Sequence, residues 1–391
     1  MIPLFKVFMS DEAISKAVNV LRSGYIGQGL VVEEFEGYLK EFLSTDFVAT
    51  TNSATSAEHL AYHLLKSSGD IWMSIHESPQ LFAWPGLAPG DEVLASPLTC
   101  TATNWPILAN DLSIKWVDTD PETLSMDLVD LRRKITPKTK IISIVHWGGY
   151  PADLNEIRSI QRESYEKFGF APVVIEDCAH ALGSLYDGQP IGSHGNICTF
   201  SFQAIKHVTS VDGGALVVPH QNLYARAKLL RWYGIDRESN RKDFRCEADI
   251  PEWGFKFHMN DVNASIGLEN LKHFSYISQG FKRCDHYYRE SLADCSGVTL
   301  IQTDLGKRDT NPWLFSLLVD DKHQFYRKMH SKGITVSQVH ERNDKHSCVS
   351  SFRTMLPGLD MICERLICLP CGWWVTDDDL DFISQAIKEG W

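Results

Sequence analysis

The chain has 391 residues, of which 43% are hydrophobic and 23% are charged. This length is enough for two or three domains with large cores, and the charged fraction excludes wholesale disorder. Lys and Arg number 38 against 50 Asp and Glu, so the net charge is −12, which argues against a nucleic-acid polymer or a membrane surface as partner. No apolar run approaches the ~18 residues of a membrane span, and the first residues lack the pattern of a signal peptide. We therefore expect a cytoplasmic protein.

The first half of the chain alternates strands with helices. Helix-like segments at 10–21 and 31–42 precede a region in which short apolar runs are separated by longer amphipathic stretches. The seven predicted strands cover residues 46–51, 91–96, 114–118, 140–146, 172–177, 198–202 and 214–218. Apolar strands separated by helices indicate a mostly parallel sheet that is covered on both faces.

The segment 67–84 does not fit this alternation. It contains Trp, Met, Phe and Pro without a clear period. We expect an inserted loop without regular structure, and loops of this length tend to be functional or mobile.

The second half predicts fewer elements in separate groups. Helices are expected from about 224 to 273, around a loop at 236–253. The elements expected beyond them are strands at 298–301, 313–319, 333–339 and 366–369, and helices at 321–331 and 376–389. This grouping suggests a smaller α+β unit. We divide the chain into a large domain, residues 1–260, and a small C-terminal domain, residues 261–391.

Chemistry-bearing residues follow three of the predicted strands, where ligands bind in open α/β sheets. Residues 52–56, Asn-Ser-Ala-Thr-Ser, open a helix and either hold a phosphate or form an ordinary N-cap. Asp177 ends a buried strand and could cap a loop, bind a metal or pair with a ligand cation. Lys206 lies between two strands in apolar company, which is unusual for a surface lysine.

An Asp followed 29 residues later by a Lys, both at strand ends, suits pyridoxal phosphate (PLP). The lysine amine forms a Schiff base with the cofactor aldehyde, and the carboxylate pairs with the pyridine nitrogen. The sequence has no GxGxxG, P-loop, HExxH or GxSxG motif. Ten cysteines are scattered along the chain, and Cys368 and Cys371 form a single CxxC, so we expect reduced thiols and no metal site.

The sequence resembles the DegT/DnrJ/EryC1/StrS family of sugar aminotransferases over nearly the whole chain. The resemblance is carried by residues 23–29, 52–57, 89–93, 176–183, 200–206, 213–214 and 257–261, in this order and spacing. It implies PLP fold type I, the aspartate-aminotransferase-like fold: a large domain with a mostly parallel seven-stranded sheet and a smaller C-terminal α+β domain. It also implies a homodimer with active sites at the interface.

The resemblance assigns roles to individual residues. Lys206 would bind the cofactor and then shuttle the proton, and Asp177 would face the pyridine nitrogen. Ala179 would pack against one ring face, and His180 stands where the family usually has Gln, near the phenolic oxygen. The remaining assignments are Ser201, Ala54 and Thr55 to the phosphate, and Tyr25 and Gln28 to the acceptor pocket.

Two positions depart from the family pattern. Cys100 stands where the family places an aromatic residue that stacks on the cofactor ring, and a polarisable sulfur can also cover a ring. Lys256 replaces an Asn that reaches the phosphate in the partner subunit. His146, which resembles a family segment beneath the cofactor, has either a structural or a site-lining role.

The favoured function is therefore transfer of an amino group from an amino acid, with L-glutamate expected, to a keto or aldehydo sugar that is linked to a nucleotide. One alternative acceptor is a small phosphorylated or non-nucleotide keto compound. The other alternative is a non-catalytic regulatory protein on the same fold, which the presence of Lys206 and Asp177 disfavours.

Overall fold

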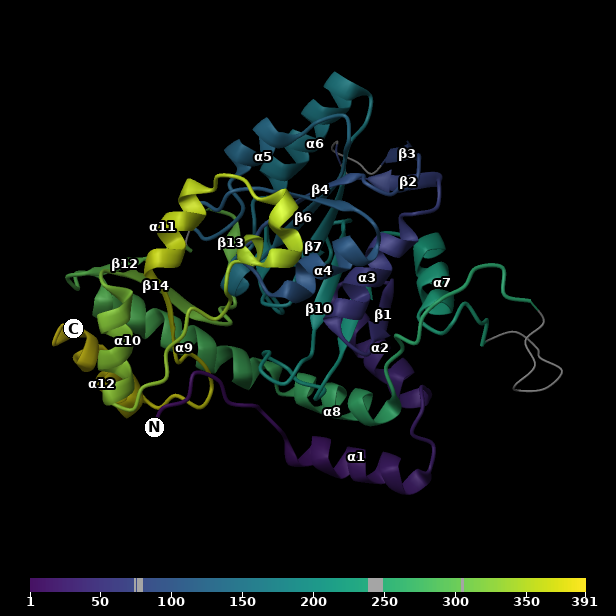
Figure 1. Ribbon diagram of the computed structural model, residues 1–391. Helices are drawn as coiled ribbons and strands as arrows, with labels where there is room; N and C mark the ends of the chain where they lie inside the picture. The colour runs from purple at the N-terminus through teal and green to yellow at the C-terminus, as the bar shows by residue number, and fades with distance from the viewer. Residues whose placement is uncertain (74, 76–79, 238–248, 304–305) are drawn as a thin grey trace.

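A seven-stranded sheet lies at the centre of the computed structural model, which describes residues 1–73, 75, 80–237, 249–303 and 306–391 (Figure 1). Its strands are β1 (Val48–Thr51), β4 (Glu92–Ala95), β5 (Ser113–Trp116), β6 (Thr139–Val145), β7 (Val173–Asp177), β10 (Ile197–Ser201) and β11 (Gly214–Val217). The spatial order is β1-β11-β10-β7-β6-β4-β5. Only β11 runs antiparallel to its two neighbours within this sheet. All seven strands expected from the sequence are confirmed.

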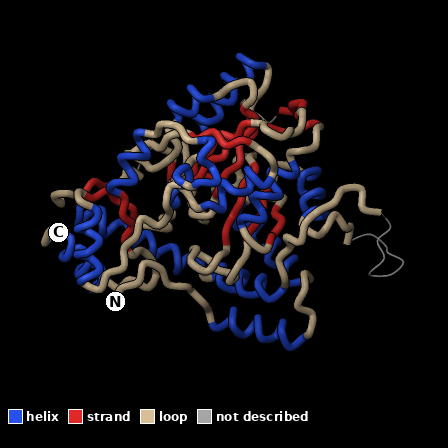
Figure 2. Tube along the Cα trace, viewed as in Figure 1, coloured by secondary structure: helices blue, strands red, loops and turns tan. Residues whose placement is uncertain are grey.

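Helices cover both faces of this sheet (Figure 2). One face is covered by α3 (Ala54–Leu64), α4 (Thr101–Ala109) and α7 (Gln221–Leu230), and the other by α2 (Leu30–Leu43), α5 (Leu128–Lys134), α6 (Leu154–Phe168) and α8 (Asp261–Lys272). Alternate side chains of one strand enter the two cores: Val173 and Ile175 pack on the α3 side, and Val174 packs on the α2 side. Because both faces are buried, the strands read as continuous apolar runs.

The N-terminal helix α1 (Asp11–Ser23) lies alongside α8 (Figure 1). Its start is set by Ser10, whose hydroxyl accepts the backbone N–H of Ala13, and its end by Gly24 at φ 76°. A left-handed glycine is the usual way to stop a helix. The residues before α1 lie against the C-terminal part of the chain, where Ile2 forms a β-bridge with Ile334.

The C-terminal part contains a second, antiparallel sheet with the order β12-β14-β15. Its elements are α9 (Phe274–Leu292), β12 (Val298–Leu300), β14 (Phe315–Val319), α10 (Lys322–Ser331), α11 (Pro357–Arg365), β15 (Leu366–Leu369) and α12 (Asp377–Lys388). Short elements connect the rest: β8 (Leu185–Tyr186), β9 (Gln189–Pro190), β13 (Arg308–Asp309) and the 3-10 helices η1 (Trp147–Gly149), η2 (Asn343–Lys345) and η3 (Ser347–Phe352). The domain boundary after residue 260 stays a prediction.

Two expectations from the sequence are wrong. The segment 67–84 is not an irregular loop but a hairpin of β2 (Gly69–Met73) and β3 (Gln80–Trp84). Ile71, Met73 and Trp84 are buried, and the Trp84 indole donates to the carbonyl of Leu65 at 2.7 Å. The two-residue period of these short strands is hidden because the apolar residues Trp72 and Leu81 lie on the exposed side.

The strand expected at 333–339 is also absent. This segment makes isolated bridges through Ile334 and Ser337, and Val339 adopts φ 65°, which ends the extended backbone. Part of the expected loop at 236–253, residues 238–248, lies outside the described residues. None of the described helices is long and apolar enough to cross a bilayer.

Candidate active site

Asp177 and Lys206 meet at the carboxyl end of the central strands. Asp177 is the last residue of β7, and Lys206 lies in the loop that connects β10 with β11. Burial lowers the pKa of the Lys206 amine to about 8, and the charge of Asp177 offsets only part of this shift. The amine therefore gives up its proton more easily than an ordinary lysine.

The Asp177 carboxylate is held by two donors. Its Oδ1 accepts the backbone N–H of Ala179 at 2.9 Å, and its Oδ2 accepts the hydroxyl of Thr103 at 2.6 Å. Thr103 is held in turn by the hydroxyl of Thr99 at 2.8 Å. These contacts fix the direction of the carboxylate, so that it can pair with a ring N–H above the end of β7.

Aromatic side chains surround the Lys206 amine. Its Nζ lies 3.5 Å from the ring centroid of Trp313, and His180 stacks on the same indole at 4.0 Å. The His180 Nδ1 accepts the backbone N–H of Gly148 at 3.3 Å, so the proton of the neutral ring lies on Nε2. Burial, followed by the Lys206 charge, holds the pKa of His180 well below its usual range. A neutral imidazole that carries its proton on Nε2 can donate a hydrogen bond, as the Gln at this position of the family pattern would.

Gly214 brings together residues that could hold a phosphate, and we call this group the phosphate cradle. This residue pairs with Ser201 on one side and with Thr51 on the other. A Cβ placed on Gly214 would lie 2.5 Å from the backbone nitrogen of Ala54, at the start of α3. Glycine therefore brings Ser201 close to the N-terminus of α3, where Ala54 and Thr55 begin the helix. Backbone N–H groups at a helix N-terminus favour an anion.

These residues fit pyridoxal phosphate as a set. An anion for the ring nitrogen, an amine of lowered pKa for the aldehyde and a cradle for the phosphate lie at one edge of the sheet. Cys100 precedes α4 and lies near the Lys206 amine. Ala179 follows Asp177 in the same turn. Together these residues could contact the ring nitrogen, the aldehyde and the phosphate of the cofactor.

Three predicted residues lie apart from this set in the single chain. Tyr25 is 84% exposed, and Tyr25 and Gln28 line a cavity of about 730 Å³ beside Asp261 that contains neither Lys206 nor Asp177. Lys256 is exposed, and its carbonyl accepts the side-chain N–H of Asn52 at 3.2 Å. Their assignment to the site stays a prediction.

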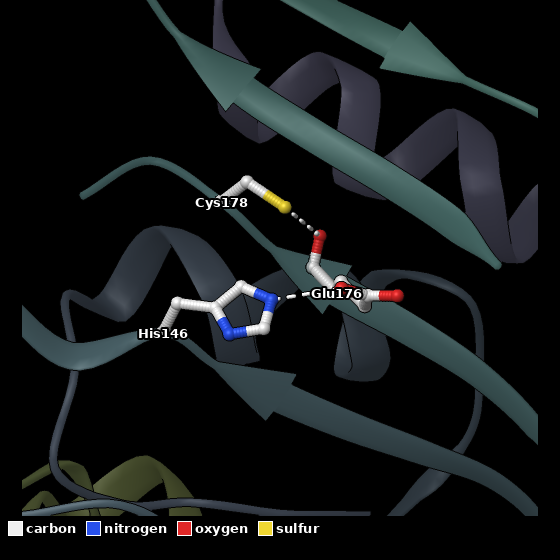
Figure 3. Close-up of side chains that lie close together, drawn as sticks. All are labelled: His146, Glu176 and Cys178. Carbon is white, nitrogen blue, oxygen red and sulfur yellow. Dashed lines mark hydrogen bonds and ion pairs between the residues drawn. The ribbon is translucent and has the colours of Figure 1, made fainter. Parts of the chain in front are cut away.

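His146, Glu176 and Cys178 form a buried cluster (Figure 3). Glu176 and Asp177 are successive residues of β7, so their side chains point to opposite faces of the sheet. The His146 Nδ1 accepts the backbone N–H of Ala152 at 3.0 Å, so its Nε2 donates to Glu176 at 2.8 Å. The Cys178 thiol donates to the Glu176 carbonyl, and burial raises the pKa of this thiol well above its usual value. Because the ligand atoms are already engaged, we assign His146 a structural role that joins β6 to β7.

Comparison with known proteins agrees with this geometry. Residues 8–388 match the model of the DegT/DnrJ/EryC1/StrS aminotransferase family. The chain belongs to this family. It is a PLP-dependent aminotransferase of fold type I. Among curated relatives, UDP-4-amino-4-deoxy-L-arabinose–oxoglutarate aminotransferase of Shewanella sediminis is 31% identical over 76% of this chain and 71% of its own length.

Two solved structures are similar to this protein over its whole chain. AtS13 from Actinomadura melliaura has 45% identity, a TM-score of 0.92 and 99% of its own chain covered. The sugar aminotransferase CalS13 from Micromonospora echinospora has 41% identity, a TM-score of 0.91 and 100% of its chain covered. The fold expected from the sequence is therefore confirmed for this family member.

Several residues that surround Lys206 and Asp177 were not expected from the sequence. Trp313 and His340 come from the C-terminal part of the chain, and the two rings lie 6.3 Å apart. Thr103 lies one helical turn after Cys100, and its hydroxyl could have been noticed beside the predicted site. Trp313 and His340 carry no local signal, because the tertiary fold alone brings them to Lys206.

Proposed function

We propose that this aminotransferase transfers an amino group from L-glutamate to a keto or aldehydo sugar that is linked to a nucleotide. The observation that carries the proposal is the Lys206 amine of lowered pKa beside Asp177, at the edge of the sheet with the phosphate cradle. The sugar acceptor is supported by CalS13, a sugar aminotransferase, and by the Shewanella relative, whose name specifies a UDP-linked amino sugar and oxoglutarate. The small phosphorylated keto compound remains the alternative acceptor.

Bound pyridoxal phosphate would supply an aldehyde and an electron-accepting ring. In this reading Ser201, Ala54 and Thr55 hold the phosphate, and Asp177 keeps the ring nitrogen protonated. His180 donates its Nε2–H to the phenolic oxygen, and Cys100 and Ala179 contact the ring. Lys206 would hold the cofactor aldehyde through its amine.

With the cofactor bound, the Lys206 amine would act as the base that accepts the proton from the Cα of the amino donor. It would return this proton as an acid, and it would take the same two roles in reverse order with the acceptor. The amine must be neutral to accept a proton, and burial favours this form. The Trp313 ring lies 3.5 Å from this amine.

The acceptor can be identified from the two half-reactions. L-glutamate should convert the yellow holoenzyme to its colourless amine form, and a nucleotide-linked keto sugar should restore the colour. We expect kcat/KM for the nucleotide-linked acceptor to exceed that for the matching free sugar phosphate by ~10²-fold, because remote binding energy raises kcat/KM. Stopped-flow absorbance measures both rates. Equal or faster restoration by a small phosphorylated keto compound would establish the alternative acceptor.

The rate of the first half-reaction should depend on the protonation of Lys206. Because the pKa of this amine is lowered to about 8, the neutral base becomes dominant as the pH rises through that value. We expect the single-turnover rate with saturating L-glutamate to rise tenfold per pH unit below pH 8 and to level off above it. A rate that is constant from pH 6 to pH 9 would contradict the role of Lys206 as base.

We also propose a homodimer in which each chain completes the site of its partner. The support is that Tyr25, Gln28 and Lys256 lie apart from Lys206 in one chain, and that Tyr25 and Leu30 are strongly exposed apolar residues. Lys256 would then neutralise the phosphate in the other subunit.

Mixing two inactive or weakened variants tests this arrangement. Lys256→Ala should weaken PLP binding about tenfold, the cost of roughly 1.5 kcal/mol expected for a lost charge contact. A hybrid of the K206A and K256A chains should regain one intact site with wild-type PLP affinity, as measured by fluorescence titration. If the hybrid binds PLP no better than K256A alone, Lys256 acts within its own chain.

A further inference from the structure

A layer of polar side chains lies beneath the active site, inside an otherwise apolar core. Asp177 on β7 and Thr199 on β10 are register partners of parallel strands, so both side chains point to the α3 face. Ser143 on β6 lies opposite Ile175, two residues before Asp177, and points to the same face. Helix α3, which covers this face of the sheet, contributes Glu58 and Tyr62, which lie one helical turn apart. We call these five residues the polar layer.

Glu58 is the buried carboxyl group of α3 in this layer. It is 2% exposed, and its Oε1 accepts the hydroxyl of Thr199 at 2.5 Å. Its Oε2 is fully buried and has no hydrogen-bond partner among the described residues. Ala57, Leu60 and Ala61 surround it on α3. An ionised carboxylate with one bare oxygen in such surroundings would be very costly.

The titratable groups near Glu58 supply no positive charge that would stabilise an ionised Glu58 carboxylate beside Asp177. They are Asp177 on β7, Tyr62 on α3 and Cys198 on β10. Each of these is neutral or negative, and none of the ion pairs between described residues involves Glu58. Burial, followed by the charge of Asp177, raises the pKa of Glu58 well above its usual value. Of two neighbouring carboxyl groups, the one with more donors keeps the charge, and Asp177 has Thr103 and Ala179.

Glu58 is also connected to the turn that carries Asp177. Thr199 donates its hydroxyl to Glu58, and its backbone carbonyl accepts the N–H of Cys178 at 2.8 Å. Cys178 directly follows Asp177. The chain of contacts from Glu58 through Thr199 to Cys178 therefore supports the end of β7 from below.

We propose that Glu58 is a positioning residue that stays a neutral carboxylic acid in the folded protein, orients Thr199 beneath Asp177 and leaves Asp177 as the one anion among the five residues of the polar layer. The functional part rests on the proposed pairing of Asp177 with the cofactor nitrogen. No role in the proton transfer itself is assigned to Glu58.

Infrared spectroscopy tests the protonation state directly. The wild-type holoenzyme at neutral pH should show the carbonyl band of a protonated carboxyl group, and Glu58→Gln should abolish it. Glu163→Gln is the matched control, because Glu163 is exposed on α6 and paired with Arg132, and it should keep the band. Labelling the wild type with ¹³C-glutamate should shift the band, a measurement that needs no substitution. A wild type without the band would overturn the proposal.

The positioning role predicts a split between two variants. Glu58→Gln keeps an oxygen that accepts the Thr199 hydroxyl, so its kcat should stay within about twofold of wild type, whereas Glu58→Leu should lose ~10-fold through misplacement of Asp177. In both variants the pKa obtained by titrating the bound cofactor's visible absorption should stay within half a unit of the wild-type pKa, because no charge is removed.

Two results would refute the proposal on Glu58 while leaving the aminotransferase assignment intact. One is a pKa of the bound cofactor, measured from its visible absorption, that is lower by one unit or more in E58Q than in wild type. Such a decrease is the effect of removing a nearby anion. The other is equal kcat for E58Q and E58L. If no variant and no wild-type preparation binds PLP, the pairing of Asp177 with the cofactor fails instead, and the infrared band still reports on Glu58.

Discussion

Replacing Lys206 with Ala should abolish transamination and prevent covalent attachment of the cofactor. The amine is needed twice, once to hold the aldehyde and once to move the proton, and no second amine of lowered pKa faces Asp177 among the described residues. The loss should be at least ~10³-fold in kcat, since positioned acid–base catalysis alone contributes 10²–10⁴-fold. Borohydride reduction followed by peptide mass spectrometry should find the cofactor on Lys206 in wild type and nowhere in K206A.

The neighbouring His207 provides the matched control. Its Nε2 lies 3.0 Å from the carbonyl of Pro312, and its ring packs on Phe281, away from Asp177. His207→Gln should therefore retain borohydride trapping on Lys206. A K206A protein with wild-type activity, or trapping on a different lysine, would remove the basis of the proposed mechanism.

Replacing Asp177 with Asn should give the second large loss. The isosteric amide keeps the shape of the site but removes the negative charge that faces the ring nitrogen, so the ring becomes a poorer electron acceptor. We expect kcat to fall ~10²–10³-fold, comparable with the loss of one preorganised electrostatic contact. PLP should still bind through Ser201 and the N-terminus of α3, and Lys206 should still be trapped by borohydride.

Thr103→Ala separates charge from orientation at the same carboxylate. It removes the 2.6 Å hydrogen bond to Asp177 and leaves the charge in place, so its effect should be about tenfold, the value of one hydrogen bond to a charged group. Steady-state kinetics and cofactor titration measure the series. If D177N and T103A lose the same activity, the charge of Asp177 is not what the reaction uses.

The local sequence was enough to place Asp177 and Lys206. Each follows an apolar run that is buried on both faces, and parallel strands bring their carboxyl ends to one edge. The family resemblance, not strand-end position, implied that Ser201 and Ala54 lie near each other. It did not show that Gly214 allows their approach, because that closeness depends on the antiparallel insertion of β11 between β1 and β10.

The sequence by itself determined the alternation of strands and helices and the edge of the sheet at which Asp177 and Lys206 lie. Only the tertiary structure decided that Trp313 lies against Lys206, that His146 is turned away from the site and that Glu58 is buried beneath Asp177. The physical reason is the distance along the chain between the residues that interact. Apolar periodicity and strand-end chemistry are properties of neighbours in the chain, whereas burial, pKa and ring contacts depend on residues that only folding brings together.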